Sequence, residues 1–454
     1  MQNLLKLKID YRLFSKYDKD YFINNKIVPI TEDTFSMKFA VCKESNLLDI
    51  KDKFTKIINF VEIEKNDIEF VLANFEQNSK LFACVEKSLN SNASEDFMKD
   101  FLKELVIYSL EKRASDIHIE KFEDLTLFKF RVDGRLKIFF SCEDKFIKNI
   151  SSYLKLISNL DITQIRLPLD GRFSIEIDEK KYDFRLSTMP TIQSESIVIR
   201  ILDNKNIDKS LENLGFSEDI LGSLKDFLKL TQGLILISGP TGSGKTTTLY
   251  SMINEINSEE KKIITIEDPV EYKLSNINQV PINSKIGLSF EIVLRNILRQ
   301  DPDIIFIGEI RDKFSLDIAL QASLTGHLVL ASIHSNSAVE TISRLIDLQA
   351  DPFLLSSSLK MVLAQRLVLQ YCKNCLAKGC NICNFTKFYD RSSLAEILKI
   401  DEEISSLIFK KSSKQELLNY LKTVNYKTLL DDGKDKVQAN ITSIEEVLKV
   451  VNAL

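Results

Sequence analysis

Glycine is scarce in this sequence, with 13 residues among 454, or about 3% where about 7% is usual. Histidine is scarcer still, with three residues at 118, 327 and 334. All three histidines and several glycines lie in short polar or charged clusters that do not look like ordinary turns; the glycines are Gly134, Gly171, Gly239, Gly242, Gly244, Gly308 and Gly326. This scarcity makes each of these positions a candidate functional residue.

The sequence also lacks long apolar runs and an excess of positive charge. The longest apolar stretches, such as 234–237 and 304–307, are far shorter than the ~18 residues that indicate a membrane span. The first ten residues carry charges where a signal peptide needs an apolar stretch. Lysine and arginine total 61 against 65 acidic residues, for a net charge of −4, so a nucleic-acid partner is not expected. We therefore expect a cytoplasmic protein.

What is present indicates a folded chain of several domains. Hydrophobic residues make up 44% and charged residues 28% of the sequence, as in ordinary globular proteins, and the length suggests about three domains. Short β-like runs and helical patches predict a small α/β domain over residues 1–88, and a helix followed by alternating strands predicts an α+β domain over 97–205. Polar stretches at 89–96 and 203–213 are predicted linkers. Residues 212–454 alternate apolar runs with helices, which is typical of a mainly parallel sheet.

A glycine-rich loop in the third domain has the pattern of a phosphate-binding site. An apolar run over 234–238 precedes it, and Lys245 and Thr246 open a helical pattern after it, which completes the motif G-x-x-x-x-G-K-[ST] in its strand–loop–helix context. Backbone N–H groups and the helix N-terminus would hold phosphates, Lys245 would reach the β- and γ-phosphates, and Thr246 would offer its hydroxyl to Mg²⁺. The alternative is a tight turn that is rich in glycine by chance. The expected nucleotide-binding residues are Gly239, Pro240, Thr241, Gly242, Ser243, Gly244, Lys245, Thr246 and Thr247.

Three further clusters follow this loop at spacings that suit successive strands of one sheet. One strand pattern ends in Glu267, a second ends in a Gly-Glu pair at Glu309, and a third lies between His327 and His334. Carboxylates at strand ends beside a phosphate loop can polarise an attacking water or hold metal-bound water. The Gly-Glu ending favours Glu309 acting on water over direct coordination of Mg²⁺. For any one cluster alone, the alternative is a helix cap or a solvated turn.

Four of the seven cysteines lie within twelve residues, at Cys372, Cys375, Cys380 and Cys383. Two Cys-x2-Cys pairs supply four thiolates, the ligand set of a closed tetrahedral Zn²⁺ site, and a cytoplasmic compartment disfavours disulfides. We predict a structural zinc site in a subdomain over 371–393; reduced thiols without metal are the alternative. Cys42, Cys84 and Cys142 are expected to be small core residues.

The clusters GPTGSGKTTTLY, IEDPVE, LRQDPDIIFIGEIRD and TGHLVLASIHSN resemble the Walker A, Asp box, Walker B and His box of the type II secretion and type IV pilus assembly ATPases. Upstream, RASDIHIE, FRVDGRL, RLPLDGRF and DFRLSTMPTIQSESIVIRIL resemble the domain that precedes the motor in that family. LLDDGKDKVQANITSIEEVLKVV resembles the family's C-terminal end, with Asn440 where glycine is usual. The resemblance covers residues 97–454.

The resemblance implies a fold of the α/β class with four parts. These are a RecA-like P-loop ATPase core, a preceding α+β (PAS-like) domain, a small N-terminal α/β domain and a C-terminal zinc-bearing helical subdomain. Family members commonly have a four-cysteine zinc site at this place, usually with a longer insert between the pairs than the four residues between Cys375 and Cys380.

The resemblance also implies site residues. Lys245 and Thr246 would bind ATP and Mg²⁺, Glu309 would be the catalytic carboxylate, and Glu267 would help to place water or metal. His327 and His334 would sense the nucleotide state.

Arginines outside these motifs complete the implied site. Arg185 and Arg200 fall where family members present arginines from the second domain to the nucleotide, and Arg295 and Arg299 match a pair near the motor site. Structural ion pairs are the alternative for each of them.

The implied function is a hexameric ATPase at the cytoplasmic face of the inner membrane, peripheral through its partners. It would drive pilin or pseudopilin assembly through an inner-membrane platform protein, in type II secretion, a type IV pilus or a DNA-uptake system. Its cofactors would be ATP, Mg²⁺ and Zn²⁺. A pilus-retraction ATPase is an alternative, although retraction members generally lack the four cysteines. A nucleic-acid translocase would need a basic channel, and a non-catalytic scaffold would not need the phosphate loop and Glu309.

Overall fold

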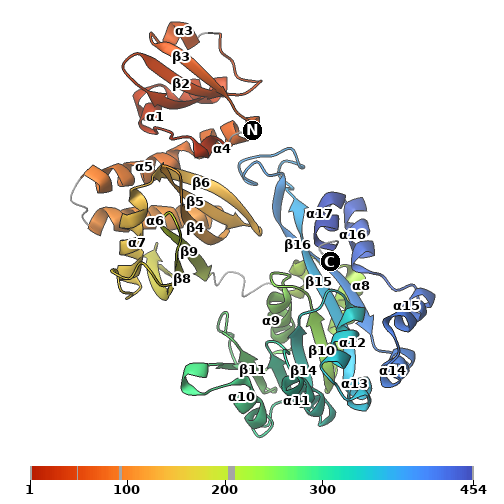
Figure 1. Cartoon of the computed structure of the whole chain (residues 1–454). Coiled ribbons are helices and arrows are strands. Elements are labelled where there is room, and N and C mark those ends of the chain that lie inside the picture. The colour runs from red at the N-terminus through yellow and green to blue at the C-terminus, as the bar shows by residue number, and fades with distance from the viewer. Residues whose placement is uncertain (1–2, 49, 91–94, 203–209, 452–454) are drawn as a thin grey trace. The chain divides into compact units, whose positions relative to one another are not determined.

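The computed structural model describes residues 3–48, 50–90, 95–202 and 210–451 (Figure 1). Much of both predicted linkers, 91–94 in the first and 203–209 in the second, lies outside the described residues. The described residues form two compact units. The first contains the N-terminal residues up to 202 and also residues 372–389, and the second contains the rest. No described helix combines the length and the apolar composition that crossing a bilayer requires.

The first unit begins with a small three-stranded sheet in the order β1-β2-β3. β2 pairs antiparallel with β1 and parallel with β3, so the short β-like runs expected in this part do form strands. The helices and strands of this part are α1 (Arg12–Lys16), α2 (Lys19–Asn25), β1 (Val28–Glu32), β2 (Ser36–Val41), α3 (Ile50–Lys53), β3 (Ile57–Glu62), α4 (Lys65–Ala73) and α5 (Phe75–Asn90), after a 3-10 turn η1 (Leu4–Lys6).

A six-stranded antiparallel sheet in the order β6-β5-β4-β9-β8-β7 follows in the same unit. The prediction of a helix and then strands is confirmed. The elements are α6 (Glu95–Glu111), β4 (Ala114–Phe122), β5 (Leu125–Val132), β6 (Arg135–Glu143), α7 (Phe146–Ile157), β7 (Leu169–Ile177), β8 (Lys180–Pro190) and β9 (Glu195–Leu202). Asp133 and Gly134 both have positive φ, of 51° and 84°, as a two-residue hairpin turn requires. Gly134 is therefore an ordinary turn residue, contrary to expectation.

One hydrophobic core runs through both parts of this first unit. Tyr11 and Phe70, from the first 88 residues, pack against Phe140 and Phe139 of β6, with ring centroids 6.2 and 5.2 Å apart. All four side chains are essentially buried. Aromatic side chains of this size contribute much of the apolar area that a core removes from water. The two predicted N-terminal domains thus share a core in the structure, and their boundaries at 88 and 97 stay predictions.

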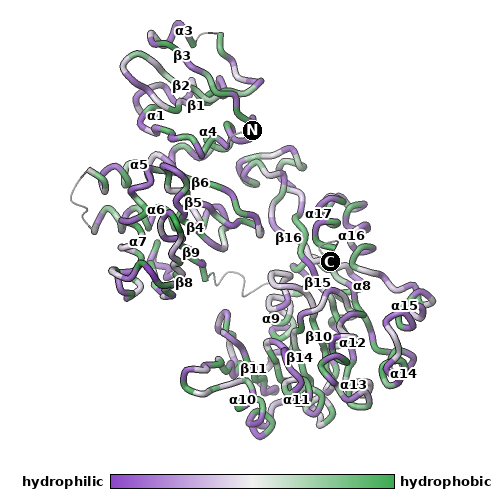
Figure 2. The backbone as a smooth tube through the Cα atoms, viewed as in Figure 1, coloured by the Kyte–Doolittle hydropathy of each residue, from purple (hydrophilic) through white to green (hydrophobic). Residues whose placement is uncertain are grey.

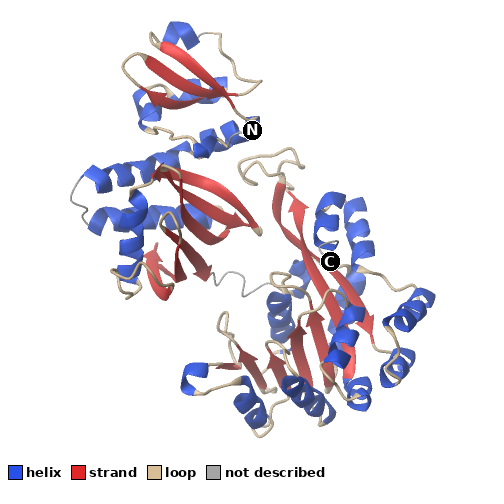
Figure 3. Cartoon of the chain, in the orientation of Figure 1, coloured by secondary structure: helices blue, strands red, loops and turns tan. Residues whose placement is uncertain are grey.

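The second unit is built on a seven-stranded sheet in the order β12-β11-β13-β14-β10-β15-β16 (Figure 3). Strands β12 to β15 in this order are parallel to their neighbours, as expected from the alternating pattern. Four central strands, β10, β11, β13 and β14, are buried along their whole length, and most of their residues are apolar (Figure 2). The strands are β10 (Gly233–Ser238), β11 (Ile263–Glu267), β12 (Asn278–Pro281), β13 (Ile304–Ile307), β14 (Leu328–Ile333), β15 (Leu359–Tyr371) and β16 (Phe388–Lys399).

Helices flank this sheet and extend beyond its last strand. Several begin at side-chain caps: Asp312 and Ser315 form a capping box at the start of α11, and Ser337 caps α12, which satisfies N–H groups that have no partner within a helix. The helices are α8 (Glu218–Phe227), α9 (Lys245–Ile256), α10 (Phe290–Ile297), α11 (Lys313–Leu324), α12 (Ala338–Asp347), α13 (Pro352–Ser358), α14 (Glu402–Phe409), α15 (Lys414–Thr423), α16 (Leu429–Gln438) and α17 (Ile444–Val451), with 3-10 turns η3 (Leu211–Leu214) and η4 (Ser284–Ile286).

The strand order of the second unit determines which loops meet. β14 lies between β10 and β13, with Ser238 in register with Ile333 and Ile307 with Ala331. Because these strands are parallel, the segments that follow them emerge at the same edge of the sheet. In open α/β sheets ligands bind at this edge, outside the carboxyl ends of the strands. The structure thus brings the segments after β10, β13 and β14 together.

Candidate active site

The phosphate loop lies between β10 and α9, as the motif predicts. Gly239, Gly242 and Gly244 have φ of 154°, 80° and 90°, values that L side chains rarely adopt. A Cβ at Gly239 would also lie 2.4 Å from Ser243 Oγ, so an alanine there would clash. The Ser243 hydroxyl is buried and has no hydrogen-bond partner among the described residues. An unsatisfied buried hydroxyl within a loop of this shape fits a loop that receives a ligand.

Lys245 is the first residue of α9, and its ammonium lies beneath the loop. Nζ donates to the carbonyl oxygens of Gly239 at 2.7 Å and of Pro240 at 3.1 Å. Burial lowers the pKa of Lys245, and the nearby carboxylate of Glu309 opposes that shift. The neighbouring Thr246 is exposed. A cation held against the loop and a free hydroxyl beside it are the groups that a magnesium–triphosphate ligand requires.

Glu309 and His334 meet at the same edge of the sheet. Glu309 follows β13 and His334 follows β14, and His334 Nε2 lies 3.2 Å from Glu309 Oε1. The second carboxylate oxygen of Glu309 accepts a hydrogen bond from Arg311 Nε at 2.7 Å. Burial lowers the pKa of His334, the charge of Lys245 lowers it further, and the Glu309 carboxylate opposes both effects. The histidine is therefore held toward its neutral form beside the carboxylate, and Arg311 is a contact that sequence analysis did not identify.

Backbone hydrogen bonds fix the segment that carries Glu309. Gly308 N donates to Ile266 O at 2.8 Å and Ile310 N donates to Ser332 O at 2.8 Å, while the Ser332 hydroxyl donates to Gly308 O at 2.5 Å. A Cβ at Gly308 would lie 2.9 Å from the carbonyl oxygen of Ile266. Glycine is thus required at 308 because neighbouring strands approach closely, and the carboxylate is positioned from both sides.

Glu267 lies at the end of β11 and is 3% exposed. Its carboxylate accepts hydrogen bonds from the hydroxyls of Tyr250 and Thr265, the latter at 2.6 Å, and from the Gln279 amide at 3.1 Å. Burial raises the pKa of Tyr250, and its hydrogen bond to Glu267 raises it further. Both oxygens of Glu267 are therefore engaged within the protein. The expected role of Glu267 in placing water or metal remains a prediction.

His327 lies at the opposite end of β14 from His334. The register pairs Leu328 with Gly233 at one end and Ile333 with Ser238 at the other, and five residue steps of about 3.3 Å put these ends about 16 Å apart. His327 Nδ1 instead lies 2.9 Å from the carbonyl oxygen of Ala322. The structure does not bring His327 to the phosphate loop of its own chain, and we leave it out of the site proposed below.

Arg185 and Arg200 form part of a row of charged residues in the first unit. Arg185 of β8 pairs in register with Arg200 of β9 and with Arg172 of β7, and Arg200 pairs with Asp116 of β4. Residues directly opposite one another in antiparallel strands lie on the same face, where like charges destabilise the sheet. Arg200 Nε lies 3.0 Å from Asp116 Oδ1, whereas the buried Nε of Arg185 has no hydrogen-bond partner among the described residues. Arg131 of β5 is also in register with Asp116, so four arginines against one aspartate leave positive charge in this row.

Arg295 lies on α10 and Arg299 lies in the turn that follows it, and both are exposed. Arg295 Nη2 is 2.5 Å from Glu291 Oε1, one turn away on the same helix, and its guanidinium lies over the Phe314 ring. Arg299 donates to the carbonyl oxygen of Arg295 at 3.1 Å. The Arg295 contact matches the alternative of structural ion pairing, whereas Arg299 donates to a backbone carbonyl and to the Asn296 amide. A role for either arginine at the site stays a prediction.

The four clustered cysteines converge in the segment between β15 and β16. Their sulfur atoms all lie within 4.8 Å of one another, with separations of 3.9 Å for Cys372–Cys380 and 3.8 Å for both Cys375–Cys383 and Cys380–Cys383. Four thiolates bound at about 2.3 Å to one tetrahedral Zn²⁺ would lie about 3.8 Å apart. The cluster is therefore compatible with a zinc site. It lies between two strands, not within a helical subdomain as expected.

The cysteine segment packs within the first unit, although both strands that carry it belong to the second unit. Lys137 Nζ donates to Asn384 O at 3.0 Å and lies 3.8 Å from the centroid of the Phe70 ring. Arg113 lies 3.7 Å over the ring of Tyr389. Burial lowers the pKa of Lys137 to about 8, and Asp67 opposes the shift. Sequence analysis did not predict this packing.

Comparison with known proteins shows the family to which this chain is related. Residues 91–449 match the family described as Type II/IV secretion system protein. The chain is 41% identical over 354 residues to the type II secretion system protein HxcR of Pseudomonas aeruginosa, covering 76% of each chain. It is 39% identical over 367 residues to the type II secretion system ATPase E of Vibrio cholerae, covering 75% of this chain and 73% of that protein.

A solved structure is also similar. The structure of the pilus retraction motor PilT with bound ADP shares 26% sequence identity with this chain at a TM-score of 0.56, covering 76% of this chain and 96% of that one. These matches fit the arrangement of phosphate loop, carboxylate and histidine at one edge of a parallel sheet.

Proposed function

Since the chain belongs to the Type II/IV secretion system protein family and is an ATPase, we propose that it hydrolyses ATP to drive pilin or pseudopilin assembly in a secretion or pilus system. The observation that carries this proposal is the convergence of the phosphate loop, Lys245, Glu309 and His334 at one sheet edge. A likeness to a retraction motor covers much of the chain, but the four converging cysteines favour assembly over retraction.

Each residue of the site has a separate task. The loop N–H groups and the helix N-terminus bind phosphates, and Lys245 exchanges its bonds to the Gly239 and Pro240 carbonyls for phosphate oxygens. Thr246 would hold Mg²⁺, which supplies charge neutralisation at the phosphates when bound. Glu309 accepts the proton of the attacking water, and its contacts with His334 and Arg311 hold its carboxylate at the edge of the sheet.

Glu309 suits the role of general base better than Glu267. Both follow parallel strands, but Glu267 is 3% exposed and accepts three hydrogen bonds from protein groups. The oxygens of Glu309 also have contacts, with Arg311 and His334, but its side chain is 19% exposed, and this greater exposure favours Glu309 as the base. Glu267 would help to place water or metal, as the resemblance implies, while its hydrogen bonds fix the end of β11.

We further propose that a neighbouring chain completes the site. The row that contains Arg172, Arg185 and Arg200 concentrates positive charge around the Arg185 Nε, from which no group in the described part of the chain accepts a hydrogen bond. Positive charge of this kind suits the γ-phosphate in the transition state. An arginine supplied in trans can contribute about 10³ to 10⁵ in rate. A ring of six chains is the assembly that the resemblance implies. Arg172 is an addition to the two arginines that sequence analysis named.

The cysteine cluster is proposed to hold one structural Zn²⁺ through Cys372, Cys375, Cys380 and Cys383. The sulfur separations support this, since they match those around a tetrahedral ion. Four protein ligands leave no open position for catalysis. The chain is proposed to work in the cytoplasm and to reach the inner membrane through a platform protein, without binding nucleic acid.

Two substitutions test the site. Lys245→Ala is expected to abolish both nucleotide binding and hydrolysis, because Lys245 contacts phosphates in the ground state. Glu309→Gln is expected to retain ATP binding and to lose at least ~100-fold in turnover. Lys229→Ala is a control lysine variant, since Lys229 is exposed and pairs with Asp226 on the surface. Turnover by Glu309→Gln at the wild-type rate would refute the assignment of the base.

A mixing experiment tests the shared site. Arg185→Ala and Lys245→Ala chains are each expected to be inactive, and their mixture is expected to regain part of the activity, because some interfaces then pair an intact loop with an intact arginine. A monomer with full turnover would refute the proposal, as would an Arg185→Ala, Arg200→Ala variant with unchanged turnover.

A further inference from the structure

Gln365 is a buried amide in the middle of β15, and it is 1% exposed. Its Oε1 accepts a hydrogen bond from the Thr248 hydroxyl of α9 at 2.8 Å, and its Nε2 donates to the Ser393 hydroxyl of β16 at 3.2 Å. A buried amide is costly unless both of its ends are bonded, and the cost is offset here. The side chain therefore joins the helix that opens at Lys245 to the last two strands of the sheet.

The same residue forms the floor of the phosphate loop. A Cβ at Gly239 would lie 2.6 Å from the carbonyl oxygen of Gln365, and a Cβ at Gly244 would lie 2.8 Å from its Nε2. The first and last glycines of the loop thus rest on the backbone and on the side chain of one residue. Their close approach is possible only because neither has a side chain.

Arg366 extends this floor toward the histidine segment. It is 6% exposed; its Nη1 donates to Gln365 O at 3.1 Å and its Nη2 donates to Asn336 O at 2.8 Å. Asn336 lies two residues after His334, which contacts Glu309. One arginine therefore connects the carbonyl beneath Gly239 to the segment that faces the catalytic carboxylate.

We propose that Gln365 is a positioning residue for the ATPase reaction. Through its contacts with Thr248 and the two glycines, Gln365 determines the position and orientation of the phosphate loop. Arg366 connects Gln365 to the segment that follows His334. The inference rests on the proposed role of the loop in binding ATP. An apolar residue at 365 would fill the same space in the strand, but it would leave the hydroxyls of Thr248 and Ser393 without a partner and the loop without an oriented floor.

The test compares nucleotide affinity with turnover in Gln365→Leu. We expect the Kd of Mg–ADP, measured by isothermal titration calorimetry on the full chain, and the KM for ATP to rise about tenfold. We expect kcat at saturating ATP to change less than threefold, because Gln365 does not touch the reacting atoms. Thr248→Val should raise the Kd and the KM in the same way. Thr248→Ser should keep the wild-type Kd, because serine retains the hydroxyl that donates a hydrogen bond to Gln365.

A double variant and a control separate positioning from general stability. If Gln365 and Thr248 act through their shared hydrogen bond, Gln365→Leu with Thr248→Val should weaken ADP binding no more than either change alone. Thr442→Val removes another buried hydroxyl, one that donates to Leu369 O in the same strand, and should lower the Tm without changing the Kd.

Several results would overturn the inference. Wild-type Kd in Gln365→Leu would show that the amide only fills the core, and multiplicative losses in the double variant would show that the two residues act independently. If Gln365→Leu does not fold, equal Kd values for Thr248→Val and Thr248→Ser would refute the inference in its place. If the wild-type chain bound no ADP, both the proposed function and this inference would be refuted. The other outcomes refute the inference alone and leave the proposed function intact.

Discussion

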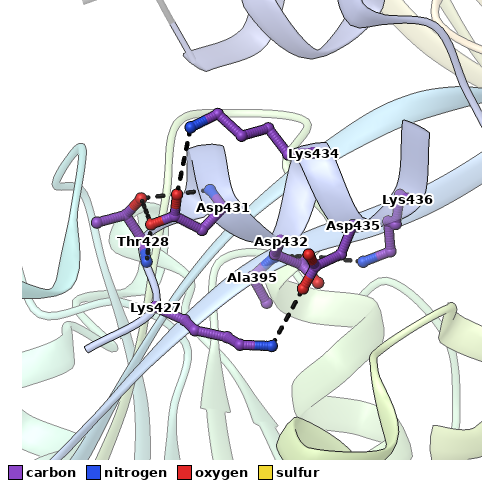
Figure 4. Close-up of polar contacts among 8 residues, drawn as sticks. All are labelled: Ala395, Lys427, Thr428, Asp431, Asp432, Lys434, Asp435 and Lys436. Atoms are coloured by element: carbon purple, nitrogen blue, oxygen red, sulfur yellow. Dashed lines mark hydrogen bonds and ion pairs between the residues drawn. The ribbon is translucent and has the colours of Figure 1, made fainter. Parts of the chain in front are cut away.

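The buried ion pair between Asp432 and Lys436 gives the largest stability effect that we expect from one substitution. Lys436 Nζ lies 2.6 Å from Asp432 Oδ2, and the side chains are 7% and 6% exposed (Figure 4). Asp432 also accepts from the backbone N–H of Ala395 at 3.0 Å, and Lys436 donates to Ser393 O at 2.6 Å. The pair therefore fixes α16 against β16, and Lys436→Met would leave a buried carboxylate and a carbonyl without their donor.

Removing one partner of a buried pair costs about 3–5 kcal/mol. A unit of this size loses about 2–4 °C in Tm for each kcal/mol, so Lys436→Met is expected to lower the Tm by about 6–20 °C. The assay is thermal unfolding followed by circular dichroism. Asp432→Asn combined with Lys436→Met should recover part of the loss, because the uncompensated charge is gone while Asn still accepts from Ala395.

Lys434→Met is the matched control on the same helix. Lys434 is 56% exposed and lies 3.5 Å from Asp431, and exposed pairs of this kind contribute about 0–1 kcal/mol. Its Tm should stay within about 2 °C of wild type. If Lys436→Met and Lys434→Met shifted the Tm equally, the reasoning that the buried pair holds α16 would be refuted.

The remaining predictions concern the metal, acid stability and helix packing. Cys380→Ser is expected to reduce zinc from about one ion per chain and to lower soluble yield, as measured by elemental analysis; wild-type protein that lacks zinc when purified without chelators would contradict this. Burial alone would raise the pKa of Glu32, but hydrogen bonds from two lysines and a tyrosine outweigh it and set the pKa at about 2, against an ordinary 4.5. The stability from this shift is present above pH 4.5 and is lost as pH falls toward 2. The free energy of unfolding in urea should therefore be lower for Glu32→Gln than for wild type at pH 7, and the two values should agree near pH 2. A difference that stayed the same at both pH values would contradict the argument. A Cβ at Gly433 would lie 2.4 Å from Val447 Cγ1, whereas one at Gly222 would meet nothing within 4 Å. Gly433→Ala should therefore destabilise the protein by about 1–3 kcal/mol, and Gly222→Ala should stabilise it slightly. The reverse order of the two Tm values would show that α16 and α17 tolerate the extra methyl group.

The residues at the carboxyl ends of the strands could be predicted from sequence because their signals are local. The phosphate-loop motif spans eight residues, and Glu309 and His334 each directly follow an apolar run. Parallel strands deliver such residues to one edge whatever the details of packing. The position of His327 was predictable in the same way, since a residue that precedes a parallel strand lies at the other edge.

The rest of the site depends on contacts between distant segments. Arg172 joins Arg185 and Arg200 only through the register of β7, β8 and β9, which no single segment encodes. Gln365 is 117 residues from Thr248, whose hydroxyl donates a hydrogen bond to it. The surrounding strand sequence is mostly apolar and predicts core residues.

The C-terminal segment that resembles the family's end packs α16 against its neighbours. Asp432 and Lys436 form the buried pair, and the glycine between them allows α17 to approach. Asp432, Gly433 and Lys436, which belong to the segment that carries the resemblance, therefore stabilise the packing of α16.

The cysteine segment has a consequence for the order in which the chain folds during synthesis. Lys112 and Lys137 contact Asn381 and Asn384, which lie 269 and 247 residues later. A ribosome adds about 5–20 residues per second, so the first unit's two lysines are synthesised some tens of seconds before the asparagines that they contact. For that interval the Lys112 and Lys137 ammonium groups lack these partners, and the contacts that join the cysteine segment to the first unit form late in synthesis.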